Sequence, residues 1–97
     1  MIVHLGTNGT VGPGQFDDMM HVLSGVRRVV IVNAKVDRPW EQEVNDTLAA
    51  GVKRFPNAVL VDWHKLGWEH PELFWRDGIH LTPDGARTYA QLIALHL

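Results

Sequence analysis

Two side chains near the C-terminus have the types and the spacing of a catalytic acid–base pair. Asp77 and His80 stand in the run DGIHLTPDGA, with Gly78 between them. A carboxylate that binds Nδ1 of an imidazole fixes its tautomer and leaves Nε2 free to take a proton from a hydroxyl nucleophile. Short Asp-x-x-His runs also arise by chance, so this spacing by itself favours an ordinary surface turn.

A second group of candidate residues follows the first apolar run, MIVHL. There Gly6-Thr7-Asn8-Gly9 offers a backbone that can approach a ligand closely at Gly6 and a neutral amide donor at Asn8. An amide donor suits the developing negative charge of an acyl-transfer intermediate. Asn-Gly is also a strong turn dipeptide, so this motif alone favours a simple turn.

Apolar runs and helical periodicity predict the elements that must position these residues. Strands are expected at residues 1–5, 28–34 and 57–63, and a loop rich in Trp, His and Pro at 64–76. Helices are expected within 11–25, within 37–55 with Pro39 as its first residue, and after a Thr82 cap. The expected buried stripes are Phe16, Met19, Met20 and Leu23; Trp40, Val44, Leu48 and Val52; and Ala86, Ala90, Ile93 and Leu97.

Alternating strands and helices predict an α/β fold with a parallel sheet and helices on its faces. Right-handed crossovers then gather the C-terminal strand ends along one edge, where ligands bind in such folds. Residues 6–9, 33–37 and 62–64 follow the three strands, and the Asp77–His80 loop can reach the same edge. Asp62 and His64 are therefore candidates for lining the site.

Composition limits the possible functions. The 97 residues allow one domain at most, and a net charge of −2 without a basic stripe gives no support for nucleic-acid binding. The absence of cysteine removes disulfides and thiolate catalysis. No zincin-like histidine spacing is present, so neither a metal nor a cofactor is expected. No apolar run is long enough to span a bilayer and no signal peptide begins the chain, so it is expected to be soluble without membrane contact.

Together, the two motifs resemble those of the SGNH (GDSL-like) hydrolase and acyltransferase superfamily. Gly6 and Asn8 match its third conserved block, and Asp77 and His80 match its fifth. The resemblance covers nearly the whole chain, so residues 1–97 are expected to be the C-terminal portion of a single SGNH domain. The run from 38 to 93 looks most like the SGNH domains joined to, or acting beside, membrane acyltransferases that O-acylate bacterial cell-wall glycans.

The resemblance implies a fold and a set of roles. The fold would be a three-layer α/β/α, flavodoxin-like sheet, incomplete with about three of five strands present. His80 would be the base, Asp77 its orienting acid and Asn8 an oxyanion-hole donor, with Gly6 and Thr7 beside it. An acyl donor, with acetyl favoured, and a carbohydrate would be the substrates, with acyltransferase and esterase both open. A longer membrane-anchored parent would place the domain outside the cytoplasm.

The chain departs from the family pattern at the nucleophile. The family's first block, Gly-Asp-Ser, lies on a strand before everything present here, and the only serine, Ser24, is expected at a helix end. Thr7 and Thr10 are interpreted as turn residues, because threonine nucleophiles usually need special activation. Gly9 replaces an Asp that is largely structural in the family. The chain alone is therefore expected to be inactive.

Two hypotheses follow from this departure. The chain is part of an SGNH enzyme whose serine lies elsewhere, or it is a truncated, non-catalytic binding or interaction module. In both, the strand at residues 1–6 would expose an apolar edge, which predicts a homodimer or a complementing chain there. Trp68, Phe74 and Trp75 could stack on a sugar, but sealing the loop over the core is the favoured interpretation.

Overall fold

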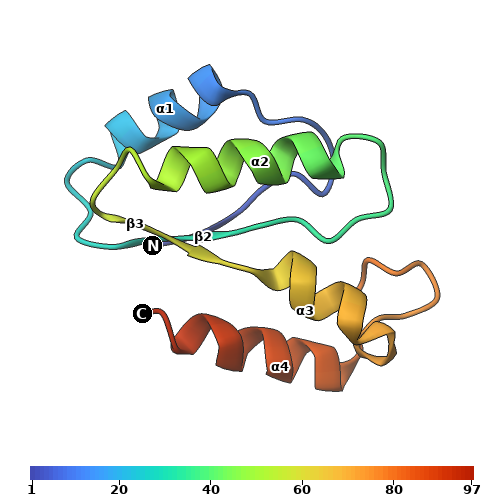
Figure 1. Cartoon of the computed structure of the whole chain (residues 1–97). Coiled ribbons are helices and arrows are strands. Elements are labelled where there is room, and N and C mark those ends of the chain that lie inside the picture. The colour runs from blue at the N-terminus through green and yellow to red at the C-terminus, as the bar shows by residue number, and fades with distance from the viewer.

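Three short strands form a parallel sheet in the order β1–β2–β3 (Figure 1). A computed structural model describes all residues 1–97, with β1 at Ile2–His4, β2 at Val29–Val32 and β3 at Ala58–Val61. All four residues of β2 are buried, as expected for a parallel strand covered on both faces. The three strands and their parallel order confirm the prediction from the sequence.

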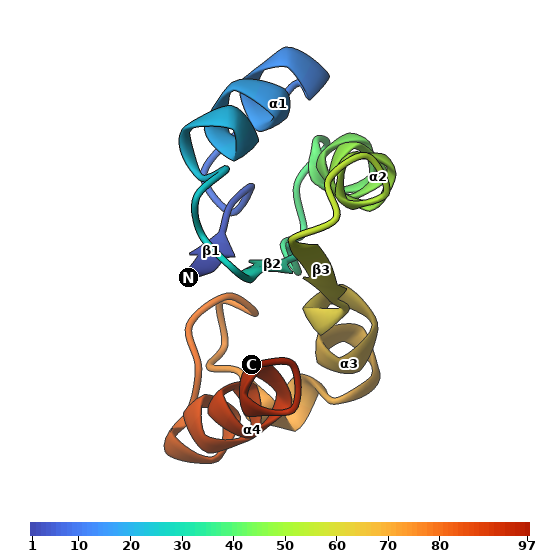
Figure 2. The same ribbon diagram turned by 90° about the vertical axis from the view of Figure 1, so that its left-hand side faces the viewer.

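Helices cover both faces of this sheet (Figure 2). On one face lie α1 (Pro13–Val22) and α2 (Glu41–Val52). On the other lie α3 (Trp63–Glu69), the 3₁₀ turn η1 (Pro71–Leu73) and α4 (Pro83–Ala94). The predicted three-layer α/β/α architecture, incomplete in its sheet, is confirmed. No helix is both long and apolar enough to cross a bilayer.

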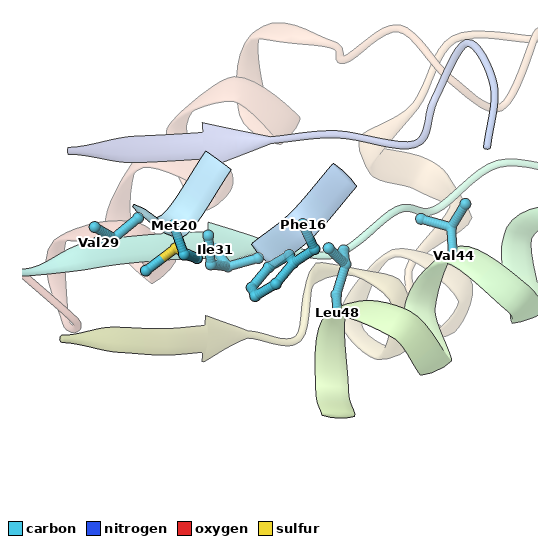
Figure 3. Packing of buried hydrophobic residues seen from close by; sticks show 6 residues of the cluster. All are labelled: Phe16, Met20, Val29, Ile31, Val44 and Leu48. Atoms are coloured by element: carbon cyan, nitrogen blue, oxygen red, sulfur yellow. The ribbon is translucent and has the colours of Figure 1, made fainter. Parts of the chain in front are cut away.

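Alternate residues of β2 supply the two halves of the core. Val29 and Ile31 point to the α1–α2 layer, and Val30 and Val32 to the α3–α4 layer, as the two-residue period of a strand requires. The first cluster, shown in Figure 3, is Phe16, Met20, Val29, Ile31, Val44 and Leu48. The second is Val30, Val32, Val61, Trp63, Phe74 and Ile93.

The start of α2 differs from its prediction. Pro39 was expected as the first helical residue, but it lies in a turn that the Glu41 backbone N–H closes on the Arg38 carbonyl, and α2 begins at Glu41. The apolar stripe itself is confirmed. Val44 and Leu48 are fully buried, and Trp40 and Val52 pack against the same cluster.

The predicted loop at 64–76 is wrong as far as Leu73, because α3 and η1 form there, and α3 also includes Trp63 from the end of the predicted strand. The Asp62 side chain accepts a hydrogen bond from the Lys65 backbone N–H at 3.1 Å and so caps the N-terminus of α3. A search for helix caps at 62 would have found this helix. The helix α3 has only seven residues, or about two turns, which is too short to give a clear apolar periodicity in the sequence.

The buried side of α4 also differs from its prediction. Ile93 is buried, but Ala86, Ala90 and Leu97 are exposed. The helix instead packs through Gly85, Tyr89, Leu92 and Ile93. Gly85 sets this rotation, because a Cβ on it would lie 2.0 Å from the Leu73 carbonyl oxygen.

Replacing Gly85 with alanine tests this backbone contact. Gly85→Ala should lower the free energy of unfolding by about 1–3 kcal/mol, because the Leu73 backbone has to move away from the new methyl group. Gly14→Ala in α1 is the matched control, since nothing lies within 4 Å of its Cβ position. It should leave stability unchanged or raise it by up to about 1 kcal/mol. Urea unfolding measures both, and equal effects would contradict this packing.

Candidate active site

Asp77 and His80 form a hydrogen-bonded pair in the loop before α4. Asp77 Oδ1 accepts the backbone N–H groups of Ile79 at 2.9 Å and of His80 at 3.0 Å. Asp77 Oδ2 lies 2.5 Å from His80 Nδ1. The loop is closed by the backbone N–H of Trp75, which donates to the His80 carbonyl at 2.8 Å. The sequence-predicted pair is therefore brought together, with the carboxylate on Nδ1.

The electrostatics of the pair keep Asp77 ionised. The hydrogen bond from His80, followed by those from the Ile79 and His80 backbone N–H groups, lowers the pKa of Asp77 from 3.8 to about 2. A carboxylate at Nδ1 assigns the proton to that nitrogen and the lone pair to Nε2. The His80 side chain is 79% exposed and its Nε2 has no partner. Nε2 is therefore free to accept a proton from an incoming hydroxyl group.

The loop after β1 borders a hollow of about 360 Å³, lined only by residues 4–11. Gly6 has a φ of +99°, and a Cβ there would lie 2.5 Å from Val44 Cγ1, so the fold itself requires glycine. Its carbonyl accepts the Trp40 indole N–H at 2.7 Å. Asn8 is exposed on this loop and its amide has no protein partner. Thr7, beside it, is half-buried and lines the same hollow.

The Asn8 loop and the Asp77–His80 loop lie at the same end of the sheet, beyond the C-terminal ends of the strands (Figure 1). This is the convergence that the topology predicts. His80 and Asp77 do not line the hollow along residues 4–11. His80 and Asn8, the candidate base and oxyanion donor, therefore lie at the same end of the sheet but do not line one common pocket.

Asp62 and His64, the other candidate lining residues, belong to a separate polar network. Asp62 Oδ1 accepts the Asn33 side-chain amide at 2.9 Å. Burial raises the pKa of Asp62, but hydrogen bonds from Asn33 and from the Lys65 backbone outweigh it and leave that pKa below its usual value. His64 Nε2 lies 2.9 Å from Glu41 Oε1. Asp62 thus joins the segment after β2 to α3, His64 joins α3 to α2, and neither side chain lines the hollow.

The aromatic residues of this region divide into two kinds. Phe74 is buried and packs against Trp63, with ring centroids 5.6 Å apart, which confirms the sealing role for this residue. Trp68 and Trp75 are 47% and 58% exposed. Trp68 is thus about half covered, with Lys35 Nζ against its ring, and only Trp75 leaves most of its surface open to solvent. Trp75 lies in the same loop as His80.

Sequence reasoning missed the residues that support these loops, above all Lys35 and Glu41. Glu41 Oε2 accepts the Val36 backbone N–H at 2.8 Å and the Trp68 indole N–H at 2.9 Å. A signal was present for Lys35, because it interrupts an apolar run directly after a buried strand. No group of three or more His, Cys, Asp or Glu side chains is gathered closely enough to hold a metal ion.

Comparison with known proteins finds relatives for nearly the whole chain, although no family model matches it. It is 40% identical over 93 residues to YrhL of Bacillus subtilis, whose name gives peptidoglycan O-acetyltransferase as a provisional activity. It is 33% identical over 93 residues to the peptidoglycan O-acetyltransferase OatA of Listeria monocytogenes. A Staphylococcus aureus protein, named provisionally as an O-acetyltransferase, is 39% identical over 85 residues.

These alignments include 88–96% of the chain but only 14–15% of each relative. The chain thus spans about one seventh of the length of the curated relatives it matches. Residues 1–97 are similar to one segment of bacterial proteins whose names assign them O-acetyl transfer.

Proposed function

We propose that residues 1–97 are part of an SGNH-type O-acyltransferase or esterase domain. The observation that carries this proposal is the exposed Asp77–His80 pair, with Nδ1 bound to a carboxylate and Nε2 free. The names of the relatives support acetyl as the acyl group and a peptidoglycan sugar as a substrate. A substrate in the peptidoglycan would place the domain outside the cytoplasm.

The chemistry would be acyl transfer through a serine ester. His80 Nε2 takes the proton of the serine hydroxyl as its Oγ attacks the ester carbonyl, and Asp77 stabilises the imidazolium that forms. The Asn8 amide donates to the tetrahedral oxyanion. His80 then gives its proton to the departing alcohol, which leaves an acyl-serine. Water or a sugar hydroxyl, deprotonated by His80 in turn, releases the acyl group as an acid or a new ester.

The serine would come from outside residues 1–97. Ser24 is the only serine in the sequence, and it follows the C-terminus of α1 at the end of the sheet where β2 begins. The loops with Asn8 and His80 lie at the opposite end of the sheet, beyond the C-terminal ends of the strands (Figure 1). This separation supports a nucleophile other than Ser24.

The edge of β1 supports a second part of the proposal, namely that another strand completes the sheet. β1 pairs only with β2, and Met1 and Ile2 are about half exposed on it. An unpaired apolar edge of this kind is a template for strand addition. The strand would come from the segment that carries the nucleophile or from a second copy of the chain.

A non-catalytic binding or interaction module is the second candidate. The separation of Ser24 from the His80 end of the sheet favours it, since such a module needs no nucleophile. The DNA upstream of Met1 distinguishes the two functions. An in-frame Gly-Asp-Ser after an apolar strand would favour the enzyme, and a ribosome-binding site directly before Met1 would favour the module.

Ester hydrolysis tests the assignment of the base. The 97-residue chain and its His80→Ala variant should both hydrolyse p-nitrophenyl acetate at the background rate, because neither contains the nucleophile. A form extended by a Gly-Asp-Ser strand should be active, and His80→Ala in that form should lower kcat by about 10²–10⁴-fold. Activity of the 97-residue chain that is lost in His80→Ala would contradict the external serine.

The titration of Asp77 tests the geometry of the pair. Because the folded pKa lies below the unfolded value of 3.8, the interaction stabilises the fold above about pH 4 and is lost as pH falls towards 2. The carboxyl ¹³C signal of Asp77 should titrate near pH 2. In His80→Ala the midpoint should rise towards 3.8, because the largest cause of the shift is removed. The same midpoint in both proteins would show that the pair does not form.

Association through β1 can be measured by sedimentation velocity and native mass spectrometry. Ile2→Lys should weaken self-association, because a charge on an edge strand opposes strand addition. Val22→Lys on α1 is the matched control, since Val22 is also exposed but belongs to a helix and not to the edge strand. A monomeric chain with slow amide exchange throughout residues 1–6 would show that the edge needs no partner.

A further inference from the structure

Lys35 is a buried lysine directly behind the Asp77–His80 loop. It follows the end of β2, is 7% exposed, and takes part in no ion pair. Its ammonium donates to the Gly78 carbonyl at 2.6 Å and lies 4.4 Å and 4.1 Å from the ring centres of Trp68 and Phe74. Burying an ammonium group costs free energy, and the hydrogen bond and the two ring contacts offset part of that cost.

Two glycines, which lack a Cβ, leave room for the Lys35 side chain. A Cβ on Gly67 of α3 would lie 2.7 Å from Lys35 Cγ. A Cβ on Gly78 would lie 3.3 Å from Lys35 Nζ. The stem therefore passes against the backbone of α3 and ends against the backbone of the loop, where its charge meets one carbonyl oxygen.

The hydrogen bond from Lys35 acts on the peptide unit that holds Asp77. The carbonyl of the Gly78–Ile79 peptide accepts from Lys35, and the N–H of the same peptide donates to Asp77 Oδ1 at 2.9 Å. Because a peptide unit is planar, fixing the direction of its carbonyl fixes the direction of its N–H. Gly78 has a φ of +69°, so the loop backbone is in a conformation that needs such support.

We propose that Lys35 is a positioning residue for the Asp77–His80 pair, acting through the Gly78–Ile79 peptide. The ammonium holds the peptide, the peptide N–H holds one carboxylate oxygen, and the other oxygen holds His80 Nδ1. A charge-assisted bond at one end also polarises the peptide and strengthens the bond at its other end. The catalytic meaning of this role rests on the proposed function, but the geometry is testable without it.

Lys35→Met in the 97-residue chain tests the proposal by NMR. It keeps the stem and removes the donor, so the Asp77 carboxyl midpoint should rise from about 2 towards 3.8 and the Ile79 amide should exchange faster. Arg76→Met is the matched control, because it removes an exposed cation next to Asp77 without touching Gly78. It should leave both readouts nearly unchanged.

A folded Lys35→Met variant with the Asp77 midpoint still near 2 would overturn the proposal, as would an equal shift in Arg76→Met. A second measurement covers the case in which Lys35→Met does not fold. In the unsubstituted chain, a scalar coupling should connect Lys35 ¹⁵Nζ with the Gly78 carbonyl carbon, and its absence would also overturn the proposal. Neither readout depends on ester chemistry, so a failure of the proposed function would leave this result standing.

Discussion

The structure depends on a buried stretch of chain, residues 33–36, that continues beyond the end of β2. All four residues are buried, and only Asn33 still bonds to a neighbouring strand, through its N–H to the Val61 carbonyl of β3 at 3.2 Å. The backbone of residues 34–36 needs other partners. Asn45 of α2 supplies two bonds to the backbone of Ala34, and Glu41 accepts the Val36 N–H. These three hydrogen bonds pair the backbone of Ala34 and the Val36 N–H where the chain leaves the sheet, and they tie α2 to that exit.

The side chains of the same stretch hold the opposite layer. Asn33 binds Asp62 and the His64 backbone, which fixes the start of α3. Lys35 binds the Gly78 carbonyl in the loop before α4. One stretch of buried backbone thus couples both helical layers to the end of the sheet where the Asp77–His80 pair lies. An end built in this way positions the pair on a rigid support rather than on a free loop.

Strong periodicities made most of the fold predictable. The run at 28–34 is apolar enough to specify a strand buried on both faces, and the four-residue repeat from Trp40 to Val52 specifies α2. The errors have different physical causes: local three-residue contacts set the starts of α2 and α3, whereas the rotation of α4 depends on a contact distant in sequence. The close contact of Gly85 with Leu73 sets which side of α4 faces the core. The four-residue repeat of Ala86 and Ala90 in the sequence does not indicate that contact.

The pair itself was predictable because it is local. Asp77 and His80 are joined within one turn, so the three-residue spacing allows the carboxylate to reach the imidazole, and the second motif at Gly6 and Asn8 made that interpretation the favoured one. The surroundings of the pair were not predictable, because Lys35 reaches Gly78 across 43 positions of the chain. The roles expected for Asp62 and His64 show the reverse case. Their positions at a strand end were foreseen, but their partners Asn33 and Glu41 were not.

The residues at the strand ends form two groups: those that make contacts within the fold and those whose polar groups make none. Gly6 is required by its close contact with Val44, and Asp62 and His64 bond to neighbouring elements, so stability alone explains these three. His80 Nε2 and the Asn8 amide have no partner in the chain and contribute no contact to the core. Polar side-chain groups that have no partner within the chain remain available to bind a substrate. A proton acceptor and a neutral hydrogen-bond donor are two of the groups that ester transfer requires.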